Sequence, residues 1–457
     1  MILVSVILIA GACFLGSAYV LFKGWRLRTS IYRYDVSSDQ KFDFSQSDVS
    51  RSTARLQNGN LDIRPVIRTG ASVLLELRIR SRPLGRWLQP YIEIESAVGR
   101  WRQPFERGGS GLRYVELSPV LTDDGSSLRL SGHYLDIPDQ SVVLHTLKHG
   151  VDLAQQRMLV IGTHPDDAEI AAFGSYADRN AYIVTLTAGE AGESGPFERF
   201  SGLDIYLEKG RNRVWNSVAV PMLGGLSIDR TANLGYFDGT LQKMMERPET
   251  PVTSAQAGAE FLDTFGQSHD PGLFESRVKR RATWAHLVAD LEHLVKTTEP
   301  DIIVAPYPRL DAHPDHKLST VALVQALKNL DRRYGSLLLY ANHLSSSDHF
   351  PFGDAGDLVS LPPGIDNIYF DSIVSIPLDA RQQARKHMAL DAMIDLRPDI
   401  QIDSLRSVAS AFKRVLKLAV TDDHISYFRQ AVRANELFFE VRVSSLYEPG
   451  VTEKILG

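Results

Sequence analysis

Short apolar segments alternate with helical segments through the second part of this chain. "RMLVIG" at 157–162, "AYIVTLTAG" at 181–189 and "DIIVAPYP" at 301–308 have apolar centres, as in strands that are buried on both faces of a sheet. The segments at 167–180 and 276–300 have helical spacing of their apolar residues instead. Alternating strands and helices indicate an α/β domain with a mostly parallel sheet. In such a sheet the active site lies at the carboxyl ends of the strands.

The preceding part of the chain has a different pattern. Segments such as "SVLLELRIRS" at 72–81 and "YIEIESA" at 91–97 alternate apolar and polar residues with period two, and clusters such as "ERGGSG" separate them as turns. We therefore predict a small β-sandwich accessory domain over residues 31–150, with no catalytic constellation. The α/β pattern begins near residue 155, and further helical runs are predicted at 379–394 and 424–441.

The first 22 residues contain no charged side chain. A bilayer-spanning helix needs about 20 apolar residues, so residues 1–22 are predicted to form a transmembrane anchor. Lys23, Arg26, Arg28 and Arg33 follow it, and positive charge collects on the cytoplasmic side, so the body of a single-pass protein should face the cytoplasm. The alternatives are a buried core helix and a lipoprotein signal at Cys13.

Composition narrows the functional classes. The net charge of −5 gives no indication of nucleic-acid binding. The chain contains 1 cysteine, so a disulfide within the chain is impossible, which fits a reducing compartment.

Two histidine motifs follow two of the predicted strands. "HPDD" begins at His164 after 157–162, and "HPDH" ends at His316 after 301–308. Pro165 keeps His164 extended, and the helix dipole favours carboxylates where the next helix begins. His164 and Asp167 can then converge with His316. Two histidines and one carboxylate form a common catalytic zinc site that leaves a position for water.

The neighbouring residues provide the remaining chemistry of a metal-assisted hydrolysis. Zinc lowers the pKa of its water towards about 7, and a carboxylate that is not a ligand can accept the proton. Asp166 is placed for that role. His313 could donate to the oxyanion or to the leaving amine. Alone, either motif would be read as a helix N-terminus beside a chance histidine. Their joint position at two strand ends favours a site.

These residues resemble a known family. "THPDDAEIAAFGS" at 163–175 is similar to the signature of the PIG-L/LmbE-like zinc-dependent de-N-acetylases, and "HPDH" to their second motif. "GEAG" at 189–192, Arg211 in "KGRNRVWNSV" and "LGYFDG" at 234–239 resemble three weaker family elements. The resemblance covers roughly residues 155–445.

The resemblance implies a Rossmann-like fold, bound zinc and removal of acetyl groups from N-acetylglucosamine-type amines. It implies that Asp315 orients an imidazole, and it assigns substrate binding to Arg211, Asp238 and Glu190. Two residues depart from the family pattern: Val214 stands where the family often has an acidic residue, and Phe237 stands where proline is common. These departures leave the identity of the sugar undecided. The resemblance also implies the same metal ligands, the same base and the same transition-state histidine as the reasoning from the motifs above.

The sequence therefore predicts a membrane-anchored deacetylase that acts on an N-acetylated amino sugar, either in a glycoconjugate or glycolipid or as a soluble glycoside. Its cofactor would be Zn²⁺, with another divalent metal such as Fe²⁺ as the alternative. Two other functions stay open. One is a catalytically silent glycan-binding protein, against which the non-ligand Asp166 counts. The other is an amidase of a non-sugar acyl amine.

Overall fold

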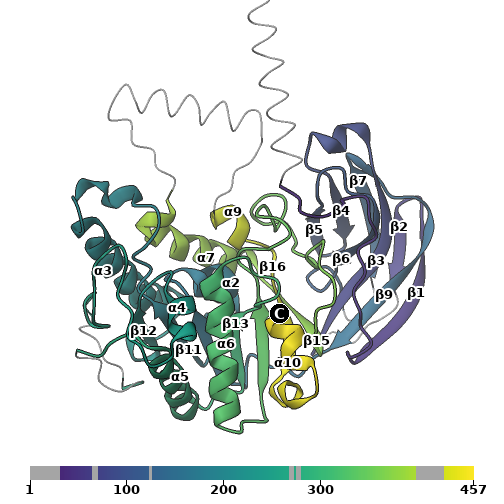
Figure 1. Ribbon diagram of the computed structural model, residues 1–457. Coiled ribbons are helices and arrows are strands. Elements are labelled where there is room, and N and C mark those ends of the chain that lie inside the picture. The colour runs from purple at the N-terminus through teal and green to yellow at the C-terminus, as the bar shows by residue number, and fades with distance from the viewer. Residues whose placement is uncertain (1–30, 64–69, 123–125, 267–271, 274–278, 398–426) are drawn as a thin grey trace, which may run out of the picture.

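The computed structural model describes residues 31–63, 70–122, 126–266, 272–273, 279–397 and 427–457, and Figure 1 shows them as two β-sheets, one of them flanked by helices. In these ranges no helix has both the length and the apolar character needed to cross a bilayer. The anchor predicted for residues 1–22 lies outside them.

The first sheet is antiparallel and has nine strands in the order β5-β4-β7-β2-β1-β9-β3-β6, with β8 paired to β3. Leu56, Leu75 and Ile92 on strands of this sheet belong to one buried hydrophobic cluster. The predicted sandwich would have two separate sheets, whereas hydrogen bonds here join every strand into one, because β1 pairs with both β2 and β9. The strands are β1 Val49–Gln57, β2 Asn60–Ile63, β3 Ala71–Ser81, β4 Tyr91–Ser96, β5 Gly99–Pro104, β6 Gly111–Glu116, β7 Ser126–His133, β8 Leu135–Asp136 and β9 Gln140–Lys148.

The second sheet has seven strands in the order β12-β11-β10-β13-β14-β16-β15. The pairs from β12 to β14 are parallel, as the buried strand pattern predicts, while β16 runs antiparallel to both β14 and β15. The strands are β10 Met158–Gly162, β11 Ala181–Thr187, β12 Thr231–Tyr236, β13 Ile302–Pro306, β14 Ser336–Tyr340, β15 Ser372–Pro377 and β16 Asn435–Arg442.

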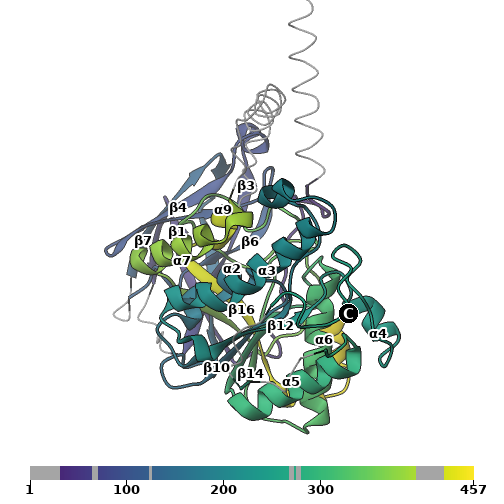
Figure 2. The same cartoon turned by 90° about the vertical axis from the view of Figure 1, so that its left-hand side faces the viewer.

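Helices cover both faces of this second sheet (Figure 2). Alternate residues of β10 point to opposite sides: Val160 packs in the cluster that contains residues of α2, α7 and α9, and Leu159 in the cluster of α4, α5, α6 and α10. This arrangement explains why the strands read as continuous apolar segments. The helices are α2 Asp167–Tyr176, α3 Asp204–Ala219, α4 Leu241–Glu246, α5 Trp284–Thr298, α6 Pro314–Asn329, α7 Ala380–Ala392, α9 Tyr427–Ala431 and α10 Val451–Leu456.

One helix prediction is partly wrong. The segment 424–441 was expected to be helical, but only α9 is helical in its described part, and Asn435–Arg442 form β16. Six of the eight residues "NELFFEVR" are buried, as expected for a strand that pairs on both sides, with β14 and with β15. Residues 424–426 lie outside the described ranges.

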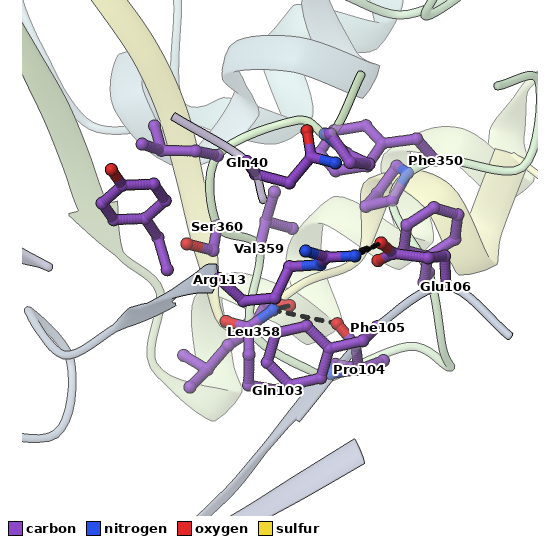
Figure 3. Close-up of a pocket in the computed structure, with 15 residues that line it drawn as sticks. Gln40, Gln103, Pro104, Phe105, Glu106, Arg113, Phe350, Leu358, Val359 and Ser360 are labelled. Atoms are coloured by element: carbon purple, nitrogen blue, oxygen red, sulfur yellow. Dashed lines mark hydrogen bonds and ion pairs between the residues drawn. The ribbon is translucent and has the colours of Figure 1, made fainter. Parts of the chain in front are cut away.

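The two sheets share a packed interface. Leu358, in the loop between β14 and β15, belongs to the hydrophobic cluster of the first sheet. Figure 3 shows the neighbouring cavity, where Arg113 on β6 reaches the carboxylate of Glu106 at 2.5 Å. Both side chains are at most 4% exposed. Arg113 also donates to the backbone oxygens of Val36 and Ser38, so it ties the segment before β1 to the first sheet.

Candidate active site

The two histidine motifs meet at the carboxyl ends of neighbouring strands. β10 pairs in parallel with β13, and α2 begins at Asp167 directly after "THPD". α6 begins at Pro314 with His313 as its N-cap, where the missing N–H of proline is tolerated. The parallel register thus brings His164 and His316 together from positions 152 residues apart.

Three ligand atoms converge at this edge of the sheet. Nδ1 of His164 lies 3.0 Å from Nε2 of His316. Oδ2 of Asp167 lies 3.1 Å from Nε2 of His316 and 3.6 Å from Nδ1 of His164. Tetrahedral zinc with bonds of about 2.0–2.2 Å leaves about 3.3–3.6 Å between neighbouring ligand atoms. The spacing of the predicted ligand set therefore fits a small divalent cation.

The hydrogen bonds of the two imidazoles point to the same conclusion. Nδ1 of His316 lies 2.9 Å from Oδ2 of Asp311, and Nε2 of His164 lies 3.0 Å from Oδ1 of Asp238. When these nitrogens donate to the carboxylates, the lone pairs of the other two nitrogens face each other and Asp167. Such a cluster of lone pairs is stable only around a cation or a proton.

The electrostatics agree with this need for positive charge. Burial disfavours a charged His164, yet the carboxylates of Asp238 and Asp167 outweigh it and raise its pKa to about 10. His316 behaves alike: burial opposes its charge, but Asp167 and Asp311 raise its pKa well above the usual range. Burial also disfavours the Asp167 carboxylate, but His316 and His164 hold its pKa well below the usual range. A metal ion would satisfy the same two imidazoles and one carboxylate.

Two other sets of side chains have ligand atoms within 4.8 Å of one another: His164 with His313 and His316, and His164 with Asp238 and Asp315. Both are less suitable. Nδ1 of His313 accepts the N–H of Asp315 at 3.2 Å. In the second set Nε2 of His164 and Oδ1 of Asp238 form a hydrogen-bonded pair 3.0 Å apart. The ligand atoms of His164, Asp167 and His316 lie 3.0–3.6 Å from one another.

Asp167 is held from several sides. Its Oδ2 accepts the backbone N–H groups of Thr163 at 3.1 Å and His164 at 2.7 Å. Its Oδ1 accepts from the side-chain amide of Asn342 at 2.8 Å. Asn342 follows β14, the strand next to β13, and no motif pointed to it. Such a fixed carboxylate presents a defined oxygen to the imidazoles.

Asp166 lies beside this set without joining it. Its Oδ2 is 3.1 Å from Nη2 of Arg213, whose Nη1 lies 2.7 Å from Asp395. Burial raises the pKa of Asp166 to about 7, against the opposing charge of Arg213. A carboxylate with that pKa can accept a proton near neutral pH.

His313 faces His164 edge to face, with ring centroids 4.7 Å apart. Burial, reinforced by the charges of His164 and His316, lowers its pKa to about 4. His313 is therefore neutral at pH 7, and because Nδ1 accepts a hydrogen bond, Nε2 carries the proton. A neutral imidazole of this tautomer can donate a hydrogen bond into the cleft.

Two of the remaining residues make contacts other than those expected. Arg211 is 52% exposed and pairs with Glu208, so Arg213, and not Arg211, reaches the cleft. Asp315 was expected to orient an imidazole: its backbone N–H donates to Nδ1 of His313 at 3.2 Å, while its carboxylate Oδ2 accepts the backbone N–H of Gly239 at 2.6 Å. Asp311 makes the contact to His316 instead.

Glu190 and Asp238 have different surroundings. Glu190 is fully buried, where it accepts from the backbone N–H of Asp238 at 3.1 Å and from the hydroxyl of Ser254 at 2.6 Å. It supports the loop of Asp238 and does not line the cleft. Asp238 does line it, with 16% of its side chain exposed, while bonded to His164.

A cleft of about 550 Å³ opens at these residues, and Ile170 is its single apolar lining residue among those described. The lining residues are His164, Asp166, Asp167, Ile170, Arg213, Asp238, His313 and His343. The missed Arg213 had a signal in the sequence: Lys209, Arg213 and Ser217 are four apart on α3, and Lys209 and Ser217 are buried. No comparable signal in the sequence pointed to Asn342 or Asp311, because only the fold brings these two residues to the predicted metal ligands.

Fold and site together place a set of side chains that could hold a metal ion at the carboxyl ends of parallel strands in an α/β domain. Residues 159–327 match the family model of the GlcNAc-PI de-N-acetylases, PIG-L. The matched part is 169 of the 457 residues, and the match indicates a hydrolase that acts on amide bonds. No curated protein matches the chain.

Several solved structures resemble it distantly. The A40926 pseudoaglycone deacetylase Dbv21 has 17% identity and a TM-score of 0.32, and the match covers 63% of this chain and 98% of that one. GalB, the 4-carboxy-2-hydroxymuconate hydratase of Pseudomonas putida KT2440, has 13% identity and a TM-score of 0.31, with 63% and 96% covered. The acetyl xylan esterase Est2A of Butyrivibrio proteoclasticus has 12% identity and a TM-score of 0.20, with 63% and 82% covered. Likenesses as low as these do not bear on the activity.

Proposed function

We propose that this protein is a membrane-anchored, zinc-dependent deacetylase that removes the N-acetyl group from an N-acetylglucosamine-type amino sugar. The observation that carries the proposal is the convergence of His164, Asp167 and His316 in a PIG-L domain, with the non-ligand carboxylate of Asp166 beside them. A binding protein that only holds a metal and a glycan has no use for a buried carboxylate with a pKa near 7.

The chain's own residues divide the chemistry between them. A divalent cation held by His164, Asp167 and His316 would activate a water and polarise the amide carbonyl. Asp166 takes the proton of the attacking water and can return it to the leaving amine. Neutral His313 donates its Nε2–H to the carbonyl oxygen as negative charge develops there. Arg213 holds Asp166 in place through its guanidinium.

The lining of the cleft supports a sugar as the substrate. Seven of the eight lining residues are polar or charged, and they offer both donors and acceptors to hydroxyl groups. Arg213 and Asp238 are the candidates for these contacts, since both line the cleft without being metal ligands in this proposal. For a long apolar acyl amine, by contrast, the eight lining residues provide one apolar side chain, Ile170.

The position of the segment before β1 supports a membrane-borne substrate. The backbone N–H of Arg33 donates to the oxygen of Ser346 at 2.9 Å, and its guanidinium donates to that of Ser345 at 2.8 Å. His343, in the same loop, lines the cleft. About 11 residues separate Arg33 from the predicted span 1–22, and at about 3.6 Å per residue they reach at most about 40 Å. The site would therefore stay close to the bilayer, on the cytoplasmic side if Lys23, Arg26 and Arg28 follow the positive-inside rule.

We further propose that residues 31–150 form an accessory domain that positions the catalytic domain, residues 155–445. Ser372 on β15 donates through its hydroxyl to the oxygen of Lys148, and Ser375 donates its N–H to the hydroxyl of Ser72. These bonds join the two units across the sheets and give the second unit a fixed support.

The test is acetate release by the full chain in detergent, loaded with Zn²⁺ or Fe²⁺, on a panel of N-acetylhexosamine glycolipids, soluble glycosides and non-sugar N-acetyl amines. We expect turnover on the amino sugars and none with Asp166→Asn. Turnover confined to the non-sugar amines would replace the proposal by the amidase function. Metal binding without turnover on any of them would favour the silent glycan-binding protein.

A further inference from the structure

The turn between β3 and β4 exposes an unusual group of side chains. It contains the short 3-10 helix Pro83–Arg86 and the two residues after it. Leu84 is 59% exposed, while Trp87 and Leu88 are each 39% exposed. The backbone N–H groups of Trp87 and Leu88 both bond to the oxygen of Leu84, so the three apolar residues occupy one turn. We call Arg82, Leu84, Arg86, Trp87 and Leu88 the tip patch.

The tip patch lies beside the segment that leads back to the amino terminus. Gly108 donates its N–H to the oxygen of Gly85 at 2.9 Å. A Cβ atom added to Gly108 would lie 3.6 Å from Cγ2 of Val36 and 3.8 Å from Cγ of Arg86. The N–H of Ser110 also bonds to the oxygen of Val36 at 3.0 Å. Val36, on the segment between the predicted anchor and β1, therefore lies beside the exposed turn.

We propose that the tip patch contacts the surface of the bilayer in which residues 1–22 are anchored. This inference rests on the proposed anchor and adds a second point of contact to it. Trp and Leu at the tip suit the boundary between lipid headgroups and acyl chains, where Trp is enriched. Arg82 and Arg86, both exposed, suit anionic headgroups.

The charges around the patch agree with this occupant. The sequence from residue 23 to Val36 contains four basic residues, Lys23, Arg26, Arg28 and Arg33, against one acidic residue, Asp35. Acidic groups are present as well: Asp136 pairs with Arg82 at 2.6 Å, and the exposed Asp35 precedes Val36. A surface of exposed aliphatic and indole groups with surrounding arginines matches an interface that is apolar below and anionic above.

A second contact changes what the anchor can do. A single span alone leaves the body free to turn relative to the bilayer. The tip belongs to the first sheet, which packs against the α/β part through Leu74, Tyr114 and Leu147 in the shared hydrophobic cluster. Docking of the tip would therefore fix the orientation of the cleft as well as its distance from the lipid.

The test uses the full chain with Cys13→Ser, reconstituted in vesicles of phosphatidylcholine and phosphatidylserine. Leu84→Cys carries an environment-sensitive fluorophore at the tip. Val98→Cys is the matched control, because Val98 is 57% exposed on the same sheet but lies beyond the other end of β4. That strand has 6 residues, about 20 Å of chain. Quenching by lipids brominated on their acyl chains reports contact with the bilayer.

We expect the label at Leu84→Cys to lose most of its emission and the label at Val98→Cys to keep it. Equal, weak quenching at both positions in protein that still floats with the vesicles would overturn the tip contact and leave the anchor intact. Protein that does not float with the vesicles would overturn both. A label at Leu84→Cys that responds to soluble glycan and not to brominated lipid would also overturn the contact, and would assign the tip to glycan binding.

Discussion

Nη2 of Arg213 lies 3.1 Å from Oδ2 of Asp166, and on its other side the same guanidinium holds Asp395 at 2.7 Å. The proposed base thus shares its cation with a second carboxylate. Burial, together with the negative charges of Asp167 and Asp395, explains how Asp166 has a pKa near 7 while an arginine is beside it.

The first prediction follows from that pair. The base is active when ionised, so kcat/KM should fall as the pH drops through about 7. Arg213→Ala removes the charge that stabilises the Asp166 carboxylate, and a lost partner of this kind raises a pKa by about 1–3 units. The acidic limb of the pH profile should therefore move to higher pH. Arg211→Ala is the matched control and should leave the profile unchanged, since Arg211 is 52% exposed and pairs with Glu208. Identical profiles for both variants would remove Arg213 from this role.

The second prediction separates the base from the ligand. Asp166→Asn should keep metal and fold but lose at least about 10²- to 10⁴-fold in kcat/KM, the usual contribution of a general base. Asp167→Ala should lose metal and activity together, because its Oδ2 faces both imidazoles. Elemental analysis beside kinetics measures the two effects. Stoichiometric zinc in Asp167→Ala would show that the ligand set is different.

The third prediction concerns the imidazole of His316. Asp311→Asn replaces the carboxylate that fixes its tautomer at 2.9 Å. Metal affinity should fall about 10- to 100-fold, as for other carboxylates that orient a ligating histidine. Asp315→Asn is the control: its Oδ2 contacts the N–H of Gly239, so affinity should change little. Competition with a zinc chelator gives both values. An Asp315→Asn variant that loses more metal than Asp311→Asn would reverse the assignment.

The fourth prediction concerns the buried ion pair of the first sheet. Arg113→Met leaves the carboxyl group of Glu106, which is 2% exposed, without its partner. Breaking such a pair costs about 3–5 kcal/mol. Arg78→Met on the adjacent strand removes an exposed pair with Asp39 and should change stability little. Thermal unfolding of the detergent-solubilised chain compares them, and Arg113→Met with Glu106→Gln should recover part of the loss. Equal midpoints for the two single variants would contradict this reasoning.

The sequence was sufficient for the centre of the site but not for its surroundings. His164, Asp167 and His316 could be inferred because each follows a recognisable buried strand, and parallel strands bring such ends to one edge. Asp311 and Asn342 could not, since their contacts depend on how two loops turn after β13 and β14. Arg213 differs from Arg211 by 2 positions on one helix, and only the buried face of α3 decides between them.

The limits of the fold prediction have a similar cause. Period two identifies strands in residues 31–150 but not which of them pair, so one continuous sheet and a two-sheet sandwich have the same local pattern. β16 contains adjacent apolar residues, Leu437, Phe438 and Phe439, that fit a helix as well as a strand buried on both faces. Pairing with β14 and β15, which lie far away in the sequence, decides its conformation.

The bonds from Arg33 to the backbone of Ser345 and Ser346 have a kinetic consequence. With residues 1–22 in a bilayer, the cleft would sample a thin layer above the lipid instead of the whole solution. A lipid-borne substrate would then be met by lateral diffusion, at a high effective concentration that depends on its mole fraction among the lipids. Adding inert lipid at a fixed amount of enzyme and substrate would slow turnover, whereas adding water would not.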